Sequence, residues 1–310
     1  MRPLVTGAAG FVGANIVRRL QASGVDVVAC ARPGSDPWRL EGVDCEVRSV
    51  DLADAAAVTA LIDDVAPDVI VNAAAHGAYS WQTDFAAMLA VNVAAVDHLL
   101  ELSVERGISL VHLGSSSEYG RQPVPPTELA RPDPNSHYAI TKLAGAQLVC
   151  DAVARRGLVA VVLRLYSVYG SWEEPARLMP TLARAMGEGR LPPLVDPNIA
   201  RDFVHVDDVV DLIITWMTAP VIVDDLPIVN VGSGTQTTLR DIVDTACAIA
   251  TIDAEPDWGS MPNRSWDTTV WQADPSRAKQ LFGWHASTSI EDGLRSLMAF
   301  VSSQTRYRDE

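Results

Sequence analysis

Short apolar runs alternate with amphipathic stretches through the first half of the chain. The apolar runs predict buried strands before residue 6, at 25–31, ending at 50–52, at 69–72 and at 110–113. The stretches between them carry apolar residues at helical spacing and predict helices from residue 11, over 54–65, over 84–105 and from 135 onward. Strands that alternate with helices are typical of right-handed βαβ units. The pattern therefore predicts an α/β fold built on a doubly wound parallel sheet.

The turn after the first strand reads Thr6-Gly7-Ala8-Ala9-Gly10-Phe11-Val12-Gly13 and leads directly into the first helix. Gly7 can adopt the backbone angles of a tight turn, Gly10 lets a pyrophosphate approach the main chain, and Gly13 lets the helix pack closely on the strand. The unpaired N–H groups at the start of the helix attract an anion. In this context the glycine pattern predicts a dinucleotide site made by Gly7, Gly10, Phe11, Val12 and Gly13.

The ends of the next strands supply further candidate contacts to the cofactor. Arg32 follows the second strand, where an acidic residue would accept the ribose 2′-hydroxyl of NAD and an arginine suits the 2′-phosphate of NADP. The sequence therefore favours NADP(H), with NAD(H) as the alternative if Asp36 serves the ribose. Ligands lie at the carboxyl ends of parallel strands, so Ala73 and Ala74 are expected beside the cofactor. His76 follows them as a loop residue and candidate substrate contact rather than a proton carrier.

Tyr138 and Lys142 are four residues apart in a predicted helix, so both side chains lie on one face. A phenol with an ordinary pKa of about 10 is a poor proton carrier at neutral pH, and we expect the nearby ammonium to lower that pKa. Ser115, at the end of the neighbouring strand, can hydrogen-bond the same substrate oxygen. The alternative is a solvated Tyr–Lys pair on the surface of an amphipathic helix.

The second half of the chain leaves the sheet and rejoins it. Segment 170–199 departs and carries a predicted helix at 179–187, residues 203–217 and 228–231 return, and residues after 234 add helices that include 239–250 and 290–301. We expect a dinucleotide-binding domain of residues 1–169 with 203–231, and a smaller, interleaved substrate domain of residues 170–202 and 232–310.

Pro3 has no N–H for a strand ladder, so it must be the first residue of its strand.

Composition limits the partners. The chain has 310 residues and a formal net charge of −15, which disfavours nucleic acid and anionic membranes. No uninterrupted apolar run reaches the ~18 residues of a membrane span, and the first strand leaves no room for a signal peptide, so we expect a cytoplasmic protein.

The four cysteines form no Cys-x-x-Cys pair, and no metal site is expected. Lys142 and Lys279 are the only lysines, so the other cationic residues are arginines, which suit phosphate groups.

Further motifs follow one another in order: Asp51-Leu52, Asn72-Ala73-Ala74, Asn92, Ser115 before Tyr119-Gly120, Tyr138-x-x-x-Lys142, Leu163-Arg164-Leu165, Tyr169-Gly170, the run from Arg201 to Asp208, and the run from Asn230 to Gly234. Together with the glycine-rich turn they resemble the extended short-chain dehydrogenase/reductase family, in its nucleotide-sugar branch with a Rossmann-type sheet. The resemblance implies that Tyr138 is the acid/base, that Lys142 binds the nicotinamide ribose, and that Ser115 orients the reacting oxygen. It also implies that Asp51 and Leu52 contact the adenine.

The same resemblance implies that Arg201 and Arg264 hold the diphosphate of a nucleotide-sugar substrate. A structural ion pair of Arg201 with Asp202 or Asp207 is the alternative. Trp258, Trp266 and Trp271 either stack on a base or fill a small core, and core packing is favoured. Relatives commonly dimerise through the helices that hold residues 84–105 and 135–156, so we expect a homodimer.

Departures from the family pattern distinguish among reactions. Nucleotide-sugar 4,6-dehydratases carry an Asp-Glu pair directly after the catalytic Ser or Thr, whereas this chain has Ser116-Ser117 there, which disfavours dehydration. Glu118 is one residue further on and should point away from the site if the segment is extended. Ser116 and Ser167 are candidate substrate contacts, and Ser167 replaces an Asn that is common in epimerases.

Two reactions at C4 of a nucleotide-linked sugar remain. Arg32 and Ser167 favour NADPH-dependent reduction of a nucleoside-diphosphate-linked 4-keto-6-deoxyhexose, with Tyr138 as the proton donor. The alternative is a C4 epimerase that retains NAD. A non-catalytic NADP-binding sensor is disfavoured because Ser115, Tyr138 and Lys142 are all present.

Overall fold

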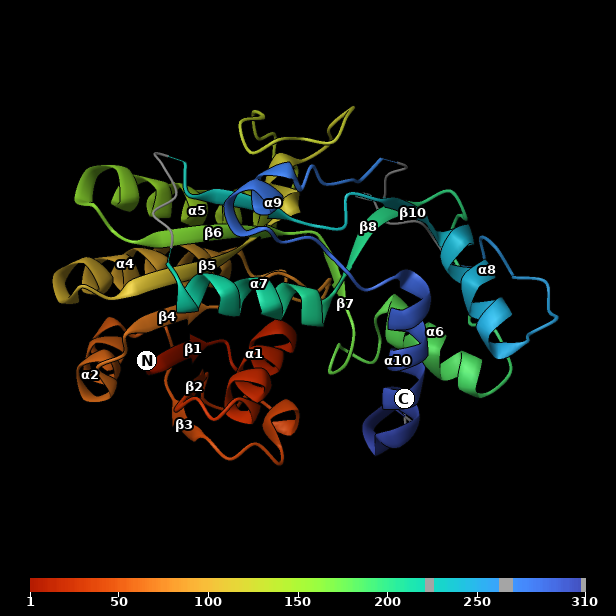
Figure 1. Ribbon diagram of the computed structural model, residues 1–310, viewed down its shortest axis with the longest axis horizontal. Helices are drawn as coiled ribbons and strands as arrows, with labels where there is room; N and C mark the ends of the chain where they lie inside the picture. Colours follow the sequence, from red (N-terminus) through yellow and green to blue (C-terminus); the bar gives the residue numbers. More distant parts are fainter. Residues whose placement is uncertain (221–225, 262–269, 308–310) are drawn as a thin grey trace.

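A seven-stranded parallel sheet forms the centre of the molecule (Figure 1). The computed structural model describes residues 1–220, 226–261 and 270–307. The strand order is β3-β2-β1-β4-β5-β6-β9, which confirms the doubly wound arrangement. The strands are β1 (Pro3–Thr6), β2 (Val28–Ala31), β3 (Glu46–Ser49), β4 (Val69–Asn72), β5 (Ser109–Ser115), β6 (Ala160–Leu165) and β9 (Ile228–Val231).

Helices cover both faces of this sheet, which explains why its strands are apolar on both sides (Figure 1). Leu4 and Val5 are neighbours in β1 and belong to the two opposite apolar clusters. One cluster is covered by α1 (Phe11–Ala22), α7 (Val206–Thr218) and α9 (Ser276–Phe282), and the other by α2 (Ala55–Val65), α4 (Ala95–Arg106) and α5 (His137–Arg156).

A smaller lobe is built around a three-stranded sheet and three helices. Strand β7 begins two residues after β6 ends, so the small sheet lies at the carboxyl end of the main one. Its helices pack around Leu182, Ile242 and Leu294, all fully buried. The elements of this lobe are β7 (Ser167–Tyr169), α6 (Leu178–Gly187), β8 (Ala200–His205), β10 (Gln236–Thr238), α8 (Leu239–Ala250) and α10 (Ile290–Ser303).

Most predicted elements are present, with some differences in extent. Pro3 is the first residue of β1, as its missing N–H required. Strand β2 starts at Val28 rather than at residue 25. Strand β8 belongs to the small sheet, so the chain returns to the main sheet with α7 rather than at residue 203. The exact division into domains remains a prediction.

The predicted helix over 84–105 is an irregular one. It consists of α3 (Phe85–Leu89), a π-helical turn (Ala90–Ala94) and α4. Among the described residues this helix alone is long and apolar enough to cross a membrane, judged by length and composition. In this fold α4 packs against α2 and α5 and buries Leu99 and Leu100, as a core helix does. The cytoplasmic location and the homodimer remain predictions.

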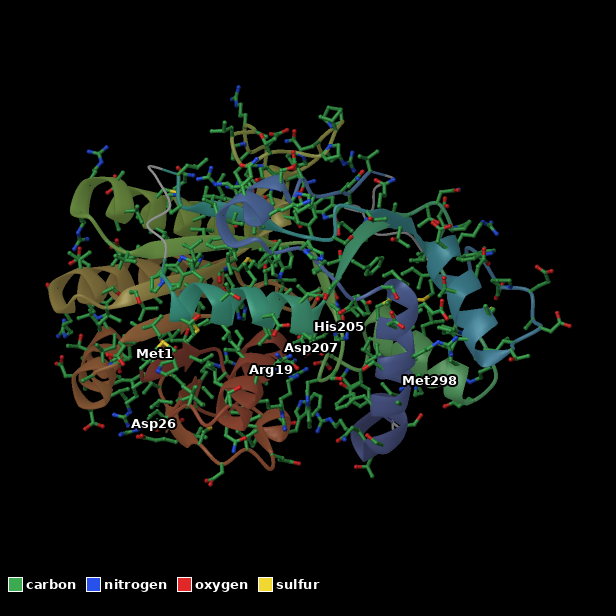
Figure 2. The ribbon with its side chains drawn as sticks, in the orientation of Figure 1. Met1, Arg19, Asp26, His205, Asp207 and Met298 are labelled. Atoms are coloured by element: carbon green, nitrogen blue, oxygen red, sulfur yellow. The ribbon has the colours of Figure 1, made fainter. Side chains whose placement is uncertain are left out.

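Side chains also join α1 and α7, which cover the same face of the main sheet (Figure 2). Arg19 of α1 lies beside Asp207 of α7, and its guanidinium pairs with Asp207 at 3.4 Å and with Asp211 at 2.5 Å. The helix that follows the glycine-rich turn is therefore tied to the segment that leads out of β8.

Candidate active site

The glycine-rich turn between β1 and α1 has the geometry expected of a phosphate-binding loop. Gly7 has a φ of +64°, and a Cβ added to it would lie 2.6 Å from the main chain of the loop after β4. A Cβ on Gly13 would collide with the Gly7 carbonyl oxygen. Gly10 precedes α1 and is exposed, while Phe11 and Val12 are half-buried. The first N–H groups of α1 have no partner within the helix, so the turn fits the pyrophosphate of a dinucleotide.

The residues after β2 lie where the adenosine end of such a cofactor would be bound. Arg32 is exposed and, within the ranges that the structure describes, has no ion-pair partner. Asp36 accepts a hydrogen bond from the Trp38 N–H at 3.1 Å and pairs with Arg306 at 3.0 Å. Arg32 is therefore available to a ligand, whereas Asp36 is already engaged.

Four more predicted cofactor contacts surround the ends of β3 and β4. Asp51 is exposed and accepts the Ala53 N–H at 3.0 Å, and Leu52 is buried beside α2. Ala73 and Ala74 are half-buried and directly follow Asn72, the last residue of β4. Their main chain lies against Gly7, and their contact with a cofactor remains a prediction.

Asn92 holds the loop that carries His76. Its side-chain oxygen accepts the His76 N–H at 2.9 Å, and its amide donates to the His76 carbonyl at 2.8 Å and to Thr141 Oγ1 at 3.0 Å. Asn92 lies in the π-helical turn and is 1 % exposed. These three hydrogen bonds join the loop after β4 to α5, and we call them the Asn92 clamp. The only indication of it in the sequence was the presence of Asn92 among the family motifs.

Ser115, Tyr138 and Lys142 come from two neighbouring elements. Ser115 is the last residue of β5, and Ser136 caps the start of α5 by accepting the Ala139 N–H at 3.2 Å. The cap sets the start of the helix and with it the face on which Tyr138 and Lys142 lie. The Ser115 side chain is close enough to the Tyr138 phenol to lower its pKa, so the predicted phenol and hydroxyl are brought together.

The expected effect of Lys142 on the phenol was wrong for this arrangement. Burial raises the pKa of Tyr138 to about 12, and the nearby Ser115 side chain offsets only part of that rise. The Lys142 ammonium donates instead to the Leu113 carbonyl at 2.6 Å, and burial lowers the pKa of Lys142 to about 8. The four-residue spacing was correct, but it did not reveal which way the buried lysine points.

The extended conformation, on which the expected orientation of Glu118 depended, is absent from this segment. Residues Ser116–Tyr119 form a 3₁₀ turn rather than an extended segment, and this turn directs Glu118 inward. Glu118 is fully buried, accepts the Ser115 N–H at 2.7 Å and pairs with Arg164 at 2.6 Å. A carboxylate therefore lies directly behind Ser115.

A small, open pocket lies beside Ser116. Trp271 closes one side and donates its indole N–H to Ser116 Oγ at 3.2 Å. The Tyr166 hydroxyl is buried and has no hydrogen-bond partner among the described residues. Trp271 therefore lines a site as well as packing, a role that the sequence left open. The pocket is lined by Ser116, Tyr119, Gly120, Gln122, Val124, Pro126, Tyr166, Val270, Trp271 and Gln272.

The predicted diphosphate-binding element lies on the small sheet. Arg201 is half-buried in β8, with its guanidinium carbon 5.7 Å from the centre of the Trp271 ring. Asp202 is fully buried and accepts hydrogen bonds from Ser233 Oγ and from the N–H groups of Ser233, Gly234 and Ala273. These donors fix Asp202, and Asp202 in turn fixes the strand that carries Arg201.

The structure describes one of the two remaining predicted substrate contacts, Ser167, but not the other, Arg264. Ser167 is half-buried at the start of β7, beside Phe203 of β8. Arg264 and Trp266 lie outside the described residues.

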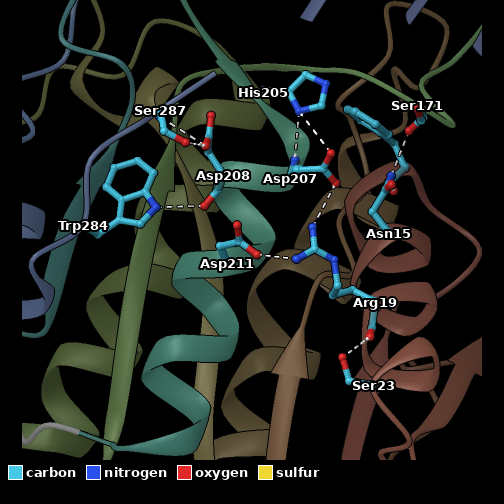
Figure 3. A network of polar contacts seen from close by, with 11 residues as sticks. Asn15, Arg19, Ser23, Ser171, His205, Asp207, Asp208, Asp211, Trp284 and Ser287 are labelled. Atoms are coloured by element: carbon cyan, nitrogen blue, oxygen red, sulfur yellow. Dashed lines mark hydrogen bonds and ion pairs between the residues drawn. The ribbon is translucent and has the colours of Figure 1, made fainter. Parts of the chain in front are cut away.

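A network of polar contacts connects the smaller lobe to helices α1 and α7 (Figure 3). Asn15 of α1 donates to the Ser171 carbonyl at 2.9 Å, and His205 Nδ1 accepts the Asp207 N–H at 3.3 Å. Asp208 accepts from Ser287 Oγ at 2.7 Å, which ties α7 to the chain before α10. Across the described ranges, no three His, Cys, Asp or Glu side chains are arranged to hold a metal ion.

Comparison with known proteins gives matches over nearly the whole chain. A sequence model of the NAD dependent epimerase/dehydratase family matches residues 3–232. The dTDP-6-deoxy-L-talose 4-dehydrogenase (NAD(P)(+)) of Kitasatospora kifunensis is 30% identical, over 97% of this chain and 96% of that protein. The UDP-glucose 4-epimerase of Mycolicibacterium smegmatis is 30% identical, over 99% of this chain and 100% of that protein. The solved structure of MoeE5 with UDP-glucuronic acid and NAD is 30% identical with a TM-score of 0.82, covering 97% of this chain and 99% of that one.

Proposed function

This chain belongs to the NAD dependent epimerase/dehydratase family, and on that premise we propose that it reduces the C4 ketone of a nucleoside-diphosphate-linked 4-keto-6-deoxyhexose with NADPH. The observation that carries the proposal is the residue set around Ser115. The Ser115 side chain is close enough to Tyr138 to lower the pKa of its phenol, while Ser116 and Ser117 occupy the places that a dehydratase gives to an acid and a base. The site therefore retains the groups for proton transfer at one oxygen and lacks those for eliminating water.

The bound nicotinamide supplies the hydride in this reaction. Tyr138 donates a proton to the oxygen that becomes the new C4 hydroxyl, and Ser115 hydrogen-bonds the same oxygen. A neutral phenol is the form that acts as an acid, and the burial that raises the pKa of Tyr138 to about 12 keeps it neutral at physiological pH. Lys142 would hold the cofactor ribose, for which its ammonium would turn from the Leu113 carbonyl.

The surrounding residues account for the choice of substrate class. Arg201 on β8 and the pocket beside Ser116 place a cation and a mixed polar and apolar wall on the side of the small lobe. Arginine binds a diphosphate through paired N–H donors, which suits a nucleotide-linked sugar. The relative from Kitasatospora kifunensis, with a dehydrogenase activity on a 6-deoxy sugar nucleotide, supports the same class.

Epimerisation at C4 is the second candidate, because the chain is as similar to a UDP-glucose 4-epimerase as it is to the dehydrogenase. The two reactions use the same Ser115, Tyr138 and Lys142. They differ in whether the cofactor would be consumed: a reductase would oxidise one NADPH for each sugar and release NADP⁺, whereas an epimerase would retain an NAD that ends in the state in which it began. The exposed Arg32 favours a cofactor with a 2′-phosphate. Arg32→Ala should raise the KM for NADPH at least tenfold and leave that for NADH nearly unchanged.

The test is to incubate the protein with the 4-keto-6-deoxyhexose nucleotide and NADPH that carries deuterium at the transferable position. Reduction predicts one NADPH consumed for each sugar and deuterium at C4 of the product. Inversion at C4 of a saturated nucleotide hexose without net consumption of cofactor would instead identify an epimerase. Neither reaction with any nucleotide sugar would refute the proposal.

A further inference from the structure

The ion pair between Glu118 and Arg164 is among the most deeply buried features near the active site. Glu118 is 0 % and Arg164 1 % exposed, and Arg164 Nε donates to Glu118 Oε2 at 2.6 Å. The Arg164 guanidinium also stacks over the Tyr119 ring at 4.4 Å. Burying two charges carries a desolvation cost that an apolar pair of similar size would avoid. A role for the charge itself is therefore worth testing.

Glu118 holds the main chain of the catalytic serine. Its Oε1 accepts the Ser115 N–H at 2.7 Å, and Ser115 Oγ accepts the Ser117 N–H at 3.2 Å in return. This reciprocal pair is a capping box, which fixes the residue before a helical turn. Gly114 makes room for it, because a Cβ there would lie 2.9 Å from Glu118 Oε1. Arg164 holds the other carboxylate oxygen, so Ser115 is linked to β6 through the ion pair.

The Glu118 carboxylate also faces the two groups whose protons matter for the reaction. Lys142 is buried, and the Glu118 charge opposes the effect of burial by favouring the ammonium. The same charge disfavours ionisation of Tyr138. Burial raises the pKa of Glu118, and the Arg164 guanidinium on β6 opposes that rise. Cys150 on α5 also interacts with Glu118, His112 on β5 interacts with Lys142, and Arg177 and Tyr79 interact with Tyr138.

We propose that Glu118, paired with Arg164, is a positioning residue: it fixes the main chain of Ser115 and places a buried negative charge that acts on Lys142. The proposal rests on the proposed function for its role in catalysis. The negative charge of Glu118 favours the ammonium form of Lys142 and disfavours the phenolate form of Tyr138. Removing that charge therefore makes both groups stronger acids. Arg164 anchors Glu118 and does not act on the reacting atoms.

The chain offers a direct measurement that needs neither substrate nor cofactor. Lys142 and Lys279 are its only lysines, so protein labelled with ¹³C at the lysine Cε gives two NMR signals. Lys279 is exposed and serves as the internal reference, and Lys279→Arg assigns the remaining signal to Lys142. The variants are Glu118→Gln and the double variant Glu118→Gln/Arg164→Met, which leaves no unpaired buried charge. Glu128→Gln is the matched control, since Glu128 is 8 % exposed and accepts the Asn230 N–H at 2.8 Å instead.

We expect the titration midpoint of Lys142 to lie near 8 in the unsubstituted protein and to fall by about one pH unit in both Glu118 variants. The Lys279 midpoint should not move, and Glu128→Gln should leave Lys142 unchanged. If Glu118→Gln does not fold, the double variant alone decides. An unchanged Lys142 midpoint in a folded Glu118 variant, or an equal shift in Glu128→Gln, would overturn the proposal.

Kinetics then separates this inference from the proposed function. If the protein reduces the keto-sugar, the basic limb of the kcat profile should move to lower pH in the Glu118 variants, with kcat at least tenfold lower and KM nearly constant. If the protein turns over no nucleotide sugar, the proposed function is refuted. The Lys142 titration then still tests whether the Glu118 charge acts on Lys142.

Discussion

Glu173 provides a stability test that depends on a single buried carboxylate. Its side chain lies in the loop between β7 and α6 and is 5 % exposed. One oxygen is 3.7 Å from Arg177 Nε, too far for a strong ion pair, and the other has no partner among the described residues. The loop is held by the main chain, because the Tyr307 hydroxyl donates to the Glu173 carbonyl at 2.5 Å. Glu173→Gln should therefore keep the fold and remove only the charge.

The size of the effect follows from the pKa. Burial raises the pKa of Glu173 from the ordinary 4.5 to about 8 in the folded protein. An acid whose folded-state pKa is raised binds its proton more tightly when folded, so stability is lost as pH rises from about 4.5 to about 8. Between pH 5 and pH 9 the loss is roughly 4 kcal/mol at about 1.4 kcal/mol per pKa unit. In a chain of this length that corresponds to about 6 °C in Tm.

The assay is thermal or urea unfolding of the original protein and of Glu173→Gln at pH 5, 7 and 9. The amide carries no charge at any pH, so the variant should gain stability relative to the original protein as pH rises, by up to about 6 °C at pH 9. Equal stability differences at pH 5 and pH 9 would refute the reasoning, and so would a variant that is less stable at both.

Three other substitutions test the site. Gly13→Ala should weaken cofactor binding at least tenfold, because its Cβ would push α1 away from Gly7; an unchanged Kd in a fluorescence titration would contradict this. Asp202→Asn should cost about 1–3 kcal/mol of unfolding free energy, since an amide cannot satisfy all four N–H and O–H donors, and chemical denaturation would detect a neutral outcome. Trp271→Phe should raise the KM for the nucleotide sugar several-fold with kcat nearly constant, because the ring remains while its hydrogen bond to Ser116 is lost. A lower kcat at constant KM would assign Trp271 a different role.

Local patterns in the sequence were enough to predict much of the fold. Strand β4 and helix α8 have the predicted limits, because a continuous apolar run and a Thr238 cap determine each of them locally. The glycine-rich turn was predicted for the same reason, since each glycine answers a steric need of its immediate neighbours.

Features that depend on distant contacts were missed. The 3₁₀ turn that directs Glu118 inward forms against Arg164, 46 residues away in sequence. Lys142 turns to the Leu113 carbonyl because β5 lies beneath α5, which spacing within one helix does not reveal. The clamp made by Asn92 depends on a π-helical turn, for which no pattern in the sequence was found.

The central claim is that Tyr138 passes a proton to the C4 oxygen of a nucleotide-linked keto-sugar. It is tested most directly by single-turnover NADPH oxidation with that substrate in the original protein and in Tyr138→Phe, with cofactor binding measured on the same samples. The account predicts a rate about 10²- to 10⁴-fold lower in the variant with the Kd for NADPH unchanged. A Tyr138→Phe protein that oxidises NADPH as fast as the original would contradict it.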